Sequence, residues 1–433
     1  MNRLGLAVLA LLVVVGAWLV LATRENDVPG SSPTAVGEPA GATLLARGEY
    51  LTRAADCVAC HTTHDGRPFA GGVAFKLPFG TIYSSNITSD PDTGIGRWSE
   101  ADFKRALHEG IRKDGEHLYP AFPYTSYTEL SSADVSAVRT YLMSLAAVRQ
   151  PNRPNELSFP FNQRVLMAFW NAAFFKSKRF DAEPARSSDW NRGAYLATAL
   201  GHCGECHTPR NIGFATERGQ EFAGSVVDGW RAPNLTADQV HGVGAWSEAS
   251  LAEYLTTGHA DGHGSAGGPM GEAVEKSLQY LSPQDAISLV AYLRSRPARA
   301  GEDPTEVNPR PSEALSSTAA APATRSGPEN TLGRRVFGWS CASCHAWNGL
   351  GRETPYASLV GARSVNDVTG SNVVKMILQG SHANIRGSDV VMPSFSNYSD
   401  VEIAATANYV VFQFGGKTGT VTADAVHAQR DSK

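Results

Sequence analysis

The sequence predicts an all-α fold in which three helical units follow one another behind an N-terminal hydrophobic helix. Three observations lead to this fold class. The chain has 433 residues, which is enough for about three domains of typical size. The pattern Cys-x-x-Cys-His occurs three times, and the copies are separated by the length of a domain. A pattern typical of a helix closes the segment after each copy.

Composition and charge narrow the class of protein. Hydrophobic residues make up 42% of the chain and charged residues 18%, so the chain can form a core and is not of the disordered class. The formal net charge is −4, and the pI is near 6.3. This charge argues against a protein that binds nucleic acid through a broad basic face, so we expect no nucleic-acid partner.

The N-terminal segment is predicted to lie in a membrane. Residues 4–22 form an apolar run of 19 residues between Arg3 and Arg24. At about 1.5 Å per residue this run would span roughly 28 Å as a helix, close to the hydrocarbon thickness of a bilayer. The apolar core of a secretory signal is usually shorter, about 7–15 residues. A retained anchor is therefore the prediction, and a signal peptide cleaved after Val20-Leu21-Ala22 is the alternative.

Shifts in composition divide the rest of the chain. Residues 23–43 are rich in Gly, Pro, Ser and Thr, which is typical of a flexible stalk. A second stretch, rich in proline and without aromatic residues, separates the last two units. In chain order, the predicted parts are a transmembrane anchor or signal peptide (1–22), the stalk (23–43), domain 1 (44–150), an aromatic connector (151–184), domain 2 (185–300), a disordered linker (301–328) and domain 3 (329–433).

The connector differs from the other two linking segments. Six aromatic residues crowd into it and three cations follow: Phe159, Phe161, Phe169, Trp170, Phe174 and Phe175, then Lys176, Lys178 and Arg179. If these rings are exposed, they form a surface for permanent docking or for a membrane interface. The alternative is that they pack between the first and second units.

The units repeat each other beyond the cysteine motif. The first and second units share three further runs: Arg47-Gly48-Glu49-Tyr50-Leu51 with Arg192-Gly193-Ala194-Tyr195-Leu196, Asn86-Ile87-Thr88 with Asn234-Leu235-Thr236, and Trp98-Ser99-Glu100 with Trp246-Ser247-Glu248. Helix-start signals precede the closing helices of the second and third units. Ser282-Pro283 places a serine cap before a proline, and Ser399 with Glu402 has the spacing of a capping box.

The cysteine motif predicts covalently bound haem. All six cysteines occur in three copies of Cys-x-x-Cys-His, the signature of c-type haem attachment. Residues three and four apart share one face of a helical turn, so both thiols and the histidine can meet one porphyrin. A redox dithiol or half a zinc site are the alternatives, but neither needs a histidine after every pair. The predicted attachment residues are Cys57, Cys60, Cys203, Cys206, Cys341 and Cys344, and the predicted iron ligands are His61, His207 and His345.

Methionine is the expected sixth iron ligand in two of the units. Met270 and Met392 each lie in a loop between the cysteine motif and the closing helix, next to proline. A small cytochrome takes its distal ligand from such a loop. Methionine there raises the reduction potential of the haem and fills the sixth coordination position of the iron. The alternative is that both are core methionines that fill gaps.

The first unit departs from this pattern. Its corresponding loop carries Phe122, whose side chain cannot coordinate iron. His117 and Met143 are the nearby candidates. A surface position for His117 and a packing role for Met143 are the alternatives, so the sixth ligand of the first haem stays open.

Several short runs are more specific than Cys-x-x-Cys-His alone. They are Arg47-Gly48-Glu49-Tyr50-Leu51, Gly80-Thr81-Ile82-Tyr83-Ser84-Ser85-Asn86-Ile87-Thr88, Gly96-Arg97-Trp98-Ser99 and Leu118-Tyr119-Pro120-Ala121. Through them, over about residues 44–415, the chain resembles the triheme cytochrome c subunit of bacterial membrane-bound dehydrogenases. That family serves alcohol, gluconate, sorbitol, fructose and aldehyde dehydrogenases. The resemblance supports the five histidine and methionine ligands named above, whereas the family often has methionine where Phe122 stands.

The expected fold is therefore three tandem class I cytochrome c domains, and the expected function is electron transfer. The resemblance implies that the chain takes electrons from a dehydrogenase catalytic subunit carrying PQQ, flavin or molybdopterin and passes them to ubiquinone or a terminal oxidase. We expect it on the periplasmic side of the cell inner membrane, with no catalytic residue of its own. The alternatives are a haem peroxidase or oxidase acting at an open first haem, and a free-standing periplasmic electron shuttle.

Overall fold

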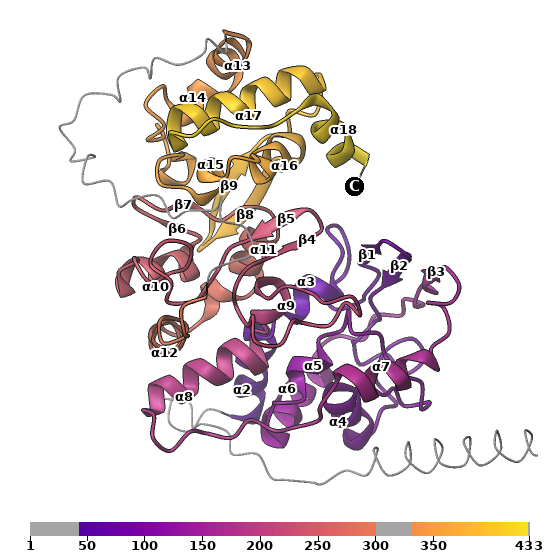
Figure 1. The fold of residues 1–433 in the computed structure, drawn as a ribbon. Helices are drawn as coiled ribbons and strands as arrows, with labels where there is room; N and C mark the ends of the chain where they lie inside the picture. The colour runs from indigo at the N-terminus through magenta and orange to yellow at the C-terminus, as the bar shows by residue number, and fades with distance from the viewer. Residues whose placement is uncertain (1–42, 300–330, 432–433) are drawn as a thin grey trace, which may run out of the picture.

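The computed structural model describes residues 43–299 and 331–431, which form three helix-rich units (Figure 1). The first unit begins with a helix that carries the Arg47 run and ends with the helix that packs against it. Its elements are α2 (Leu44–Ala54), α3 (Cys57–His61), β1 (Ala74–Leu77), β2 (Gly80–Tyr83), α4 (Glu100–Glu109), α5 (Tyr124–Tyr127) and α6 (Ser132–Ser144). The connector adds β3 (Glu156–Leu157) and α7 (Leu166–Phe174).

The second unit repeats this order of elements. Its elements are α8 (Ser188–Tyr195), the π-helix η1 (Leu196–Leu200), α9 (Gly204–His207), β4 (Ser225–Val227), β5 (Trp230–Ala232), α10 (Glu248–Thr257), β6 (His259–Ala260), β7 (Gly264–Ser265), α11 (Gly268–Lys276), the 3-10 turn η2 (Leu278–Tyr280) and α12 (Pro283–Arg294). Ser282 caps α12, with Pro283 at its first position, as the sequence predicts.

The third unit lies on the second, at the upper end of the molecule in Figure 1. Its elements are α13 (Thr331–Val336), the π-helix η3 (Phe337–Cys341), α14 (Ala342–His345), the 3-10 turn η4 (Pro355–Ala357), α15 (Arg363–Asn366), α16 (Ser371–Gln379), β8 (Ser381–Ile385), β9 (Ser388–Met392), α17 (Asp400–Gly415) and α18 (Ala423–Asp431). The capping box of Ser399 and Glu402 opens α17, as predicted.

The all-α prediction is wrong. The described residues contain nine short strands in four small sheets, and every strand pair in them is antiparallel. In the β8–β9 hairpin the chain turns through Arg386 and Gly387, both with positive φ, which matches the twist of the flanking strands. The strands are two to five residues long. Runs this short show too little alternation of polar and apolar residues to be recognised beside the helical patterns.

The N-terminal hydrophobic helix of the same prediction is also not seen. Residues 4–22 lie outside the described residues. Within residues 43–299 and 331–431, no helix combines the length and the apolar character needed to cross a bilayer. The domain boundaries given above remain predictions.

The cores show how the units are joined. One hydrophobic cluster runs through the first and second units without a break, from Leu51 on α2 to Leu293 on α12. The third unit has a separate core around Phe337 and Val410. A small cluster of Val274, Ala383 and Ile385 joins α11 to the β8–β9 hairpin. The first two units therefore form one packed body, and the third is docked on it.

The repeated glycine of the first two units allows two helices to touch. A Cβ atom added to Gly48 would lie 2.0 Å from the carbonyl oxygen of Ala137 on α6. A Cβ atom added to Gly193 would lie 1.8 Å from the carbonyl oxygen of Ser288 on α12. Only glycine permits this approach, and it sets the crossing of the first and last helices of each unit.

The repeated Asn-x-Thr run is a buried turn. Asn86 and Asn234 are each 2% exposed, and their side-chain oxygens accept hydrogen bonds from the backbone of Thr88 and Thr236. The amide of Asn234 donates to the carbonyl of Arg299 at the end of the unit. The run therefore fastens the loop after each cysteine motif to the segment that follows the closing helix.

Candidate functional site

Each cysteine motif lies on or beside a short helix. The first motif forms α3, the second ends on α9 and the third ends on α14. In the first two units the residue before the motif has left-handed backbone, with φ of 53° at Asp56 and 37° at His202. Such φ values are uncommon outside glycine, and they turn the chain sharply into the motif.

The three motif histidines are held in the same way. His61 Nδ1 lies 2.6 Å from the carbonyl oxygen of Ser85, His207 Nδ1 lies 2.7 Å from that of Pro233, and His345 Nδ1 lies 2.6 Å from that of Ala357. A backbone carbonyl fixes the proton on Nδ1, so Nε2 is left as the coordinating nitrogen. Histidines that bind metals are commonly oriented by a hydrogen bond of this kind.

Burial keeps these imidazoles neutral, as iron coordination requires. It lowers the pKa of His61 and of His345, although the hydrogen bond from Nδ1 opposes the shift. Burial, with a smaller contribution from the charge of Arg363, lowers the pKa of His207 to about 4, although the hydrogen bond from Nδ1 opposes the shift. A neutral imidazole has a lone pair to offer to iron.

The raised pKa values of five cysteines do not fit a redox-active dithiol. The six cysteines are free in the structure. Burial raises the pKa of Cys57, Cys60 and Cys203 to about 12, and that of Cys206 and Cys341 to about 11. A redox-active dithiol would instead have a lowered pKa. No group of three or more His, Cys, Asp or Glu suited to a metal occurs in the part of the chain that the structure describes.

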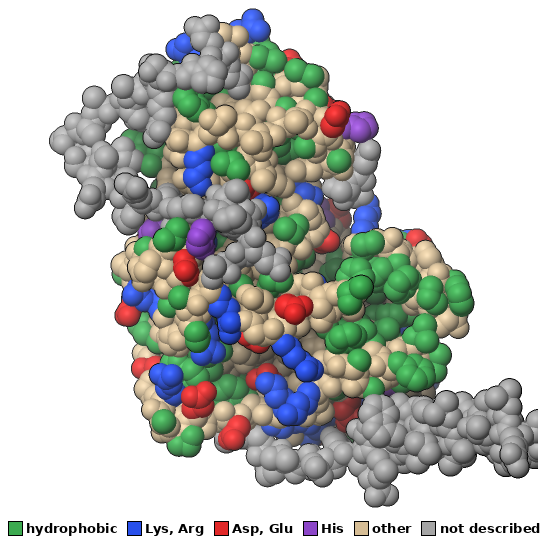
Figure 2. Space-filling model, viewed as in Figure 1, with side chains coloured by type: hydrophobic (Ala, Val, Ile, Leu, Met, Phe, Trp, Pro, Cys, Tyr) green, Lys and Arg blue, Asp and Glu red, His purple; other side chains and the backbone are tan. Residues whose placement is uncertain are grey.

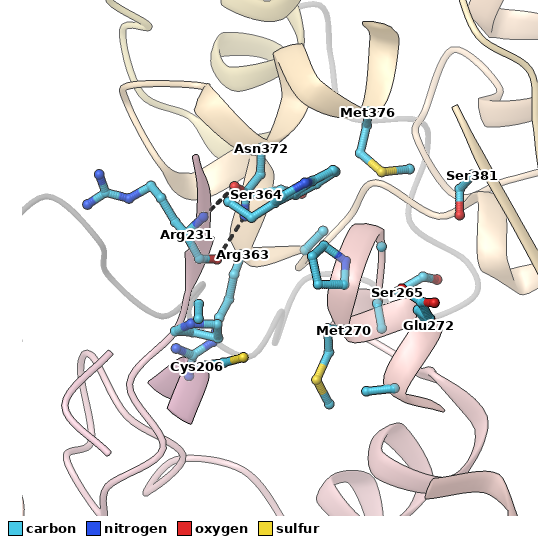
Figure 3. A pocket seen from close by; sticks show the side chains of 18 of the residues that line it. Cys206, Arg231, Ser265, Met270, Glu272, Arg363, Ser364, Asn372, Met376 and Ser381 are labelled. Atoms are coloured by element: carbon cyan, nitrogen blue, oxygen red, sulfur yellow. Dashed lines mark hydrogen bonds between the residues drawn. The ribbon is translucent and has the colours of Figure 1, made fainter. Parts of the chain in front are cut away.

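One cavity of about 1350 Å³ is lined by residues of all three units (Figure 3). Its volume exceeds the roughly 300–1,000 Å³ of a pocket for one small ligand, so it has room for more than one group. Both predicted distal ligands line it. The cavity-lining residues from the predicted sets are Cys60, Cys203, Cys206, His207, Met270, Cys341, Cys344, His345 and Met392.

In all three units the distal position lies at the same distance along the chain from a glycine that ends a helix. In each, a helix ends at a glycine with positive φ: Gly110, Gly258 or Gly380. A bridge or hairpin follows, and the distal position comes twelve residues after the glycine. That position holds Phe122, Met270 and Met392 in turn. Phe122 therefore stands where the other units present a thioether.

The other candidates near the first site are engaged elsewhere. Phe122 packs on the core, with its ring centroid 5.5 Å from that of Tyr127. His117 Nδ1 lies 3.5 Å from Nδ2 of Asn171 on α7, so its ring faces the connector. Met143 packs against the core of the first unit on α6. The position itself therefore carries a phenyl ring and not a thioether.

The sequence repeat singled out Trp246, and the structure shows its partner in the cavity wall. Trp246 stacks on His263, with ring centroids 3.6 Å apart and an angle of 17° between the rings. Two wall residues of the third unit were not predicted. Met376 of α16 lies so close to the start of α11, the helix that carries Met270, that a Cβ on Gly267 would be 2.7 Å from its sulfur. Arg363 also reaches this wall from the third unit. Met376 and Arg363 meet the second unit only when the third unit docks on it, which no pattern within one unit can show.

The residues present fit haem c at the motifs. Each imidazole is oriented with Nε2 as the coordinating atom, and the cavity has room for haem at the second and third motifs. Haem c supplies one-electron transfer at its iron when bound. The chain holds the macrocycle at the cysteines, orients the imidazoles and keeps water away with apolar side chains such as Leu255 and Leu289.

The chain matches the family model "Cytochrome c" twice, over residues 45–146 and 331–412. It is 40% identical over 401 residues to the fructose dehydrogenase cytochrome subunit of Gluconobacter japonicus, which is 89% of this chain and 82% of that protein. It is 36% identical to the gluconate 2-dehydrogenase cytochrome c subunit of Pantoea cypripedii, over 89% of each chain. It is 42% identical to a nicotinate dehydrogenase subunit of Pseudomonas putida over 93% of this chain, which spans 33% of that longer protein.

Proposed function

Because this chain belongs to the cytochrome c subunits of bacterial dehydrogenase complexes, we propose that it carries three covalent haems and conducts electrons from the catalytic subunit to ubiquinone or a terminal oxidase. Membership makes it a haem c protein and an electron-transfer subunit that works with a dehydrogenase. The number of haems, the acceptor and the cellular location are the proposal.

One observation carries the proposal of three haems. All three motif histidines donate Nδ1–H to a backbone carbonyl at 2.6–2.7 Å, so the three sites are built alike. A motif that had lost its haem would have no need to hold its imidazole in this orientation. Cys57, Cys60, Cys203, Cys206, Cys341 and Cys344 attach the haems, and His61, His207, His345, Met270 and Met392 coordinate the irons in this proposal.

The mass of the intact holoprotein tests the number of haems. We expect three haem masses on the polypeptide, and two on the variant Cys203→Ala/Cys206→Ala. His207→Ala should keep three haem masses while it changes the spectrum of one haem, because the thiols and not the imidazole form the covalent bonds. A wild-type chain with fewer than three haem masses would contradict the proposal.

The proposed place of work is the periplasmic side of the cell inner membrane. Exposed apolar side chains on the connector and on the 211–215 loop support it; we call them the aromatic surface. Its members are Phe159 (79% exposed), Phe161, Val165, Phe169 (52%), Ile212 (99%) and Phe214. Figure 2 shows hydrophobic side chains gathered over β1–β3 and α7. Rings of this kind with a neighbouring exposed lysine, Lys176, suit the boundary between lipid headgroups and acyl chains.

The connector also packs between the first and second units, which was the alternative interpretation of its sequence. The indole of Trp170 donates to the carbonyl of Gly213, and the ring of Phe161 stacks on that of Phe79 at 4.2 Å. These contacts fix the inner side of the connector. The outer side stays exposed at Phe159 and Phe169.

Binding to vesicles tests the membrane proposal. Vesicles of phosphatidylglycerol and phosphatidylethanolamine should protect residues 157–175 and 211–214 of the holoprotein from hydrogen–deuterium exchange. Phe159→Asp/Phe169→Asp should abolish this protection, because each added charge opposes entry into the interface. Val401→Asp is the matched control, since Val401 is 59% exposed on the third unit. Equal protection in both variants would show that the aromatic surface does not meet the bilayer.

A further inference from the structure

A second cavity, of about 490 Å³, lies where the connector crosses the boundary between the first and second units. Its walls come from α5 of the first unit, α7 of the connector, and α9 and α12 of the second unit. None of the motif cysteines, motif histidines and predicted distal methionines lines it, and the structure describes all of these residues. The haem sites therefore do not account for this cavity, whose volume suits a small ligand.

Basic side chains determine the charge of this second cavity. Its lining has twice as many cations as carboxylates: Lys176, Lys178, Arg210, Arg218, Arg296 and Arg299 against Glu129, Glu205 and Glu221. The whole chain, in contrast, carries a formal net charge of −4. A local excess of positive charge on a protein of negative net charge attracts anions to that place.

Half of these cations are already paired with the carboxylates. The pairs, with their N–O distances, are Lys178 with Glu129 (2.6 Å), Arg210 with Glu205 (2.7 Å) and Arg299 with Glu221 (3.5 Å). Among the described residues, Lys176, Arg218 and Arg296 have no carboxylate partner. The charges of these three side chains are therefore not offset within the described part of the chain.

Neutral contacts hold Arg296 in the cavity wall. Its Nη1 donates to the hydroxyl of Tyr292 at 3.0 Å, and its guanidinium carbon lies 4.6 Å from the centroid of the same ring. A hydroxyl and an aromatic face orient the guanidinium without neutralising it. Lys176 and Arg218 are exposed, so they form the rim of the cavity. An anion that enters between them meets a fixed cation in the wall.

The basic cavity borders directly on the aromatic surface. Trp170 and Phe174, one turn apart on α7, line the cavity, while Phe169 of the same helix is exposed on the aromatic surface. Arg210 of the cavity donates from Nη1 to the carbonyl of Phe214, another member of that surface, at 3.2 Å. Figure 2 shows Lys and Arg side chains on the same face as the hydrophobic side chains over α7, and next to them. A site for an anion and a site for apolar groups therefore lie side by side.

We propose that this cavity binds the phosphate of an anionic phospholipid whose acyl chains lie over the aromatic surface. The inference rests on the proposed function, because it requires a membrane beside the connector. One phospholipid molecule joins an anionic phosphate to apolar chains, and the two neighbouring sites match these two parts. Free phosphate would use the cations and leave the exposed rings without a partner. Gly204 and Glu205 of the second motif line the same cavity, so a bound lipid fixes this motif at the membrane surface.

Calorimetric titration of the holoprotein with dihexanoylphosphatidylglycerol, below its critical micelle concentration, tests the inference. The wild type should bind this lipid more tightly than dihexanoylphosphatidylcholine, which has the same chains and a head group without net charge. It should also bind the lipid more tightly than inorganic phosphate, which has no chains. Lys176→Gln/Arg218→Gln should weaken binding of the anionic lipid by about 30-fold, because each cation removed near an anionic head group costs about fivefold. Both side chains are exposed, so the fold does not depend on them.

Arg352→Gln/Arg386→Gln is the matched control, because it removes two exposed cations from the third unit and should leave the affinity for the lipid unchanged. Inorganic phosphate that binds as tightly as the lipid would overturn the inference, as would equal lipid affinities of the wild type and Lys176→Gln/Arg218→Gln. So would loss of the co-purifying catalytic subunit from that variant with unchanged lipid binding, which would assign the cavity to an acidic protein surface.

The inference and the proposed location fail in different experiments. If vesicles protect the connector from hydrogen–deuterium exchange while the short-chain anionic lipid does not bind, the inference alone is wrong. If vesicles leave the connector unprotected, the proposed location at the membrane is wrong, whatever the short-chain lipid does.

Discussion

The hydroxyl of Tyr50 donates to Oδ2 of Asp285 at 2.5 Å, across the boundary between the first and second units. The contact is reciprocal, since Tyr195 of the second unit donates to Oδ2 of Asp134 in the first, also at 2.5 Å. Within its own unit each aspartate binds an arginine, Arg47 on Asp134 and Arg192 on Asp285. In each Arg-Gly-x-Tyr run, the arginine therefore binds the aspartate of its own unit, and the tyrosine binds the aspartate of the neighbouring unit.

The third unit does not take part in these reciprocal hydrogen bonds. Its glycine, Gly333, is followed by Arg334 and Arg335, with no tyrosine in the run. At the position of the two aspartates, Glu402 closes a capping box with Ser399. The two reciprocal tyrosine–aspartate hydrogen bonds therefore join the first unit to the second, and the third unit docks by other contacts.

Tyr50→Phe should lower the free energy of unfolding by about 1.5–3 kcal/mol, the range for a hydrogen bond to a charged group. The lost bond leaves Asp285, which is 2% exposed, with Arg192 alone. Chemical denaturation of the holoprotein measures the change. Tyr280→Phe is the control, because Tyr280 is 44% exposed and should shift the midpoint little. Equal effects of the two substitutions would contradict a role for the reciprocal hydrogen bonds.

Gly48→Ala should destabilise the first unit by about 1–3 kcal/mol, the usual cost of overpacking. The new methyl group would lie 2.0 Å from a backbone oxygen of α6, so the two helices must move apart. Calorimetry of the holoprotein should show a lower melting temperature. Gly204→Ala should leave it unchanged, since the nearest atom to its Cβ is 3.4 Å away and the third motif carries alanine at this position.

Phe122→Met should raise the potential of the first haem and abolish its binding of carbon monoxide. In the wild type no thioether stands at this position, so the reduced protein should bind carbon monoxide at about one haem in three. Absorption difference spectra measure the binding. Met143→Leu is the decisive control. It should leave the binding unchanged, and if carbon monoxide binds only after this substitution, Met143 is the ligand.

Acid should destabilise the fold through His108. Burial, with smaller contributions from the charges of Arg179 and Lys104, lowers the pKa of this fully buried ring to about 3. The unfolded chain takes up the proton near pH 6.5, so stability is full above that pH and falls below it by about 1.4 kcal/mol per unit. Denaturation between pH 6.5 and 4.5 measures the slope. His108→Gln should reduce it, while His64→Gln at an exposed site should not.

The sequence predicted the chemistry of the sites better than the fold around them. Covalent haem follows from residue types at fixed spacing, and the caps at Ser282 and Ser399 follow from local rules. The strands were missed because a hairpin such as His259–Ala260 with Gly264–Ser265 is too short to show alternation. Its role, which is to carry the chain from a glycine to the distal position, became visible only in three dimensions.

Local sequence patterns could not predict the contacts between the units, for a different reason. Tyr50 and Asp285 are 235 residues apart, and Arg363 is 122 residues from His241. A repeat shows that the units are alike, but it does not show which face of one meets which face of another. The tyrosine of the Arg-Gly-x-Tyr run is plainly part of a repeat, yet the repeat does not reveal its partner in the neighbouring unit.

The part of the third unit in the wall of the shared cavity bears on the order of maturation. Covalent attachment requires that a haem reach Cys203 and Cys206 from outside, yet docking brings Ala362 against Gly264 and Arg363 onto the same loop. A third unit that docked early would already form one wall of the cavity at the second motif. We therefore expect haem attachment at this motif to precede docking, through a state in which the third unit stands apart from the second.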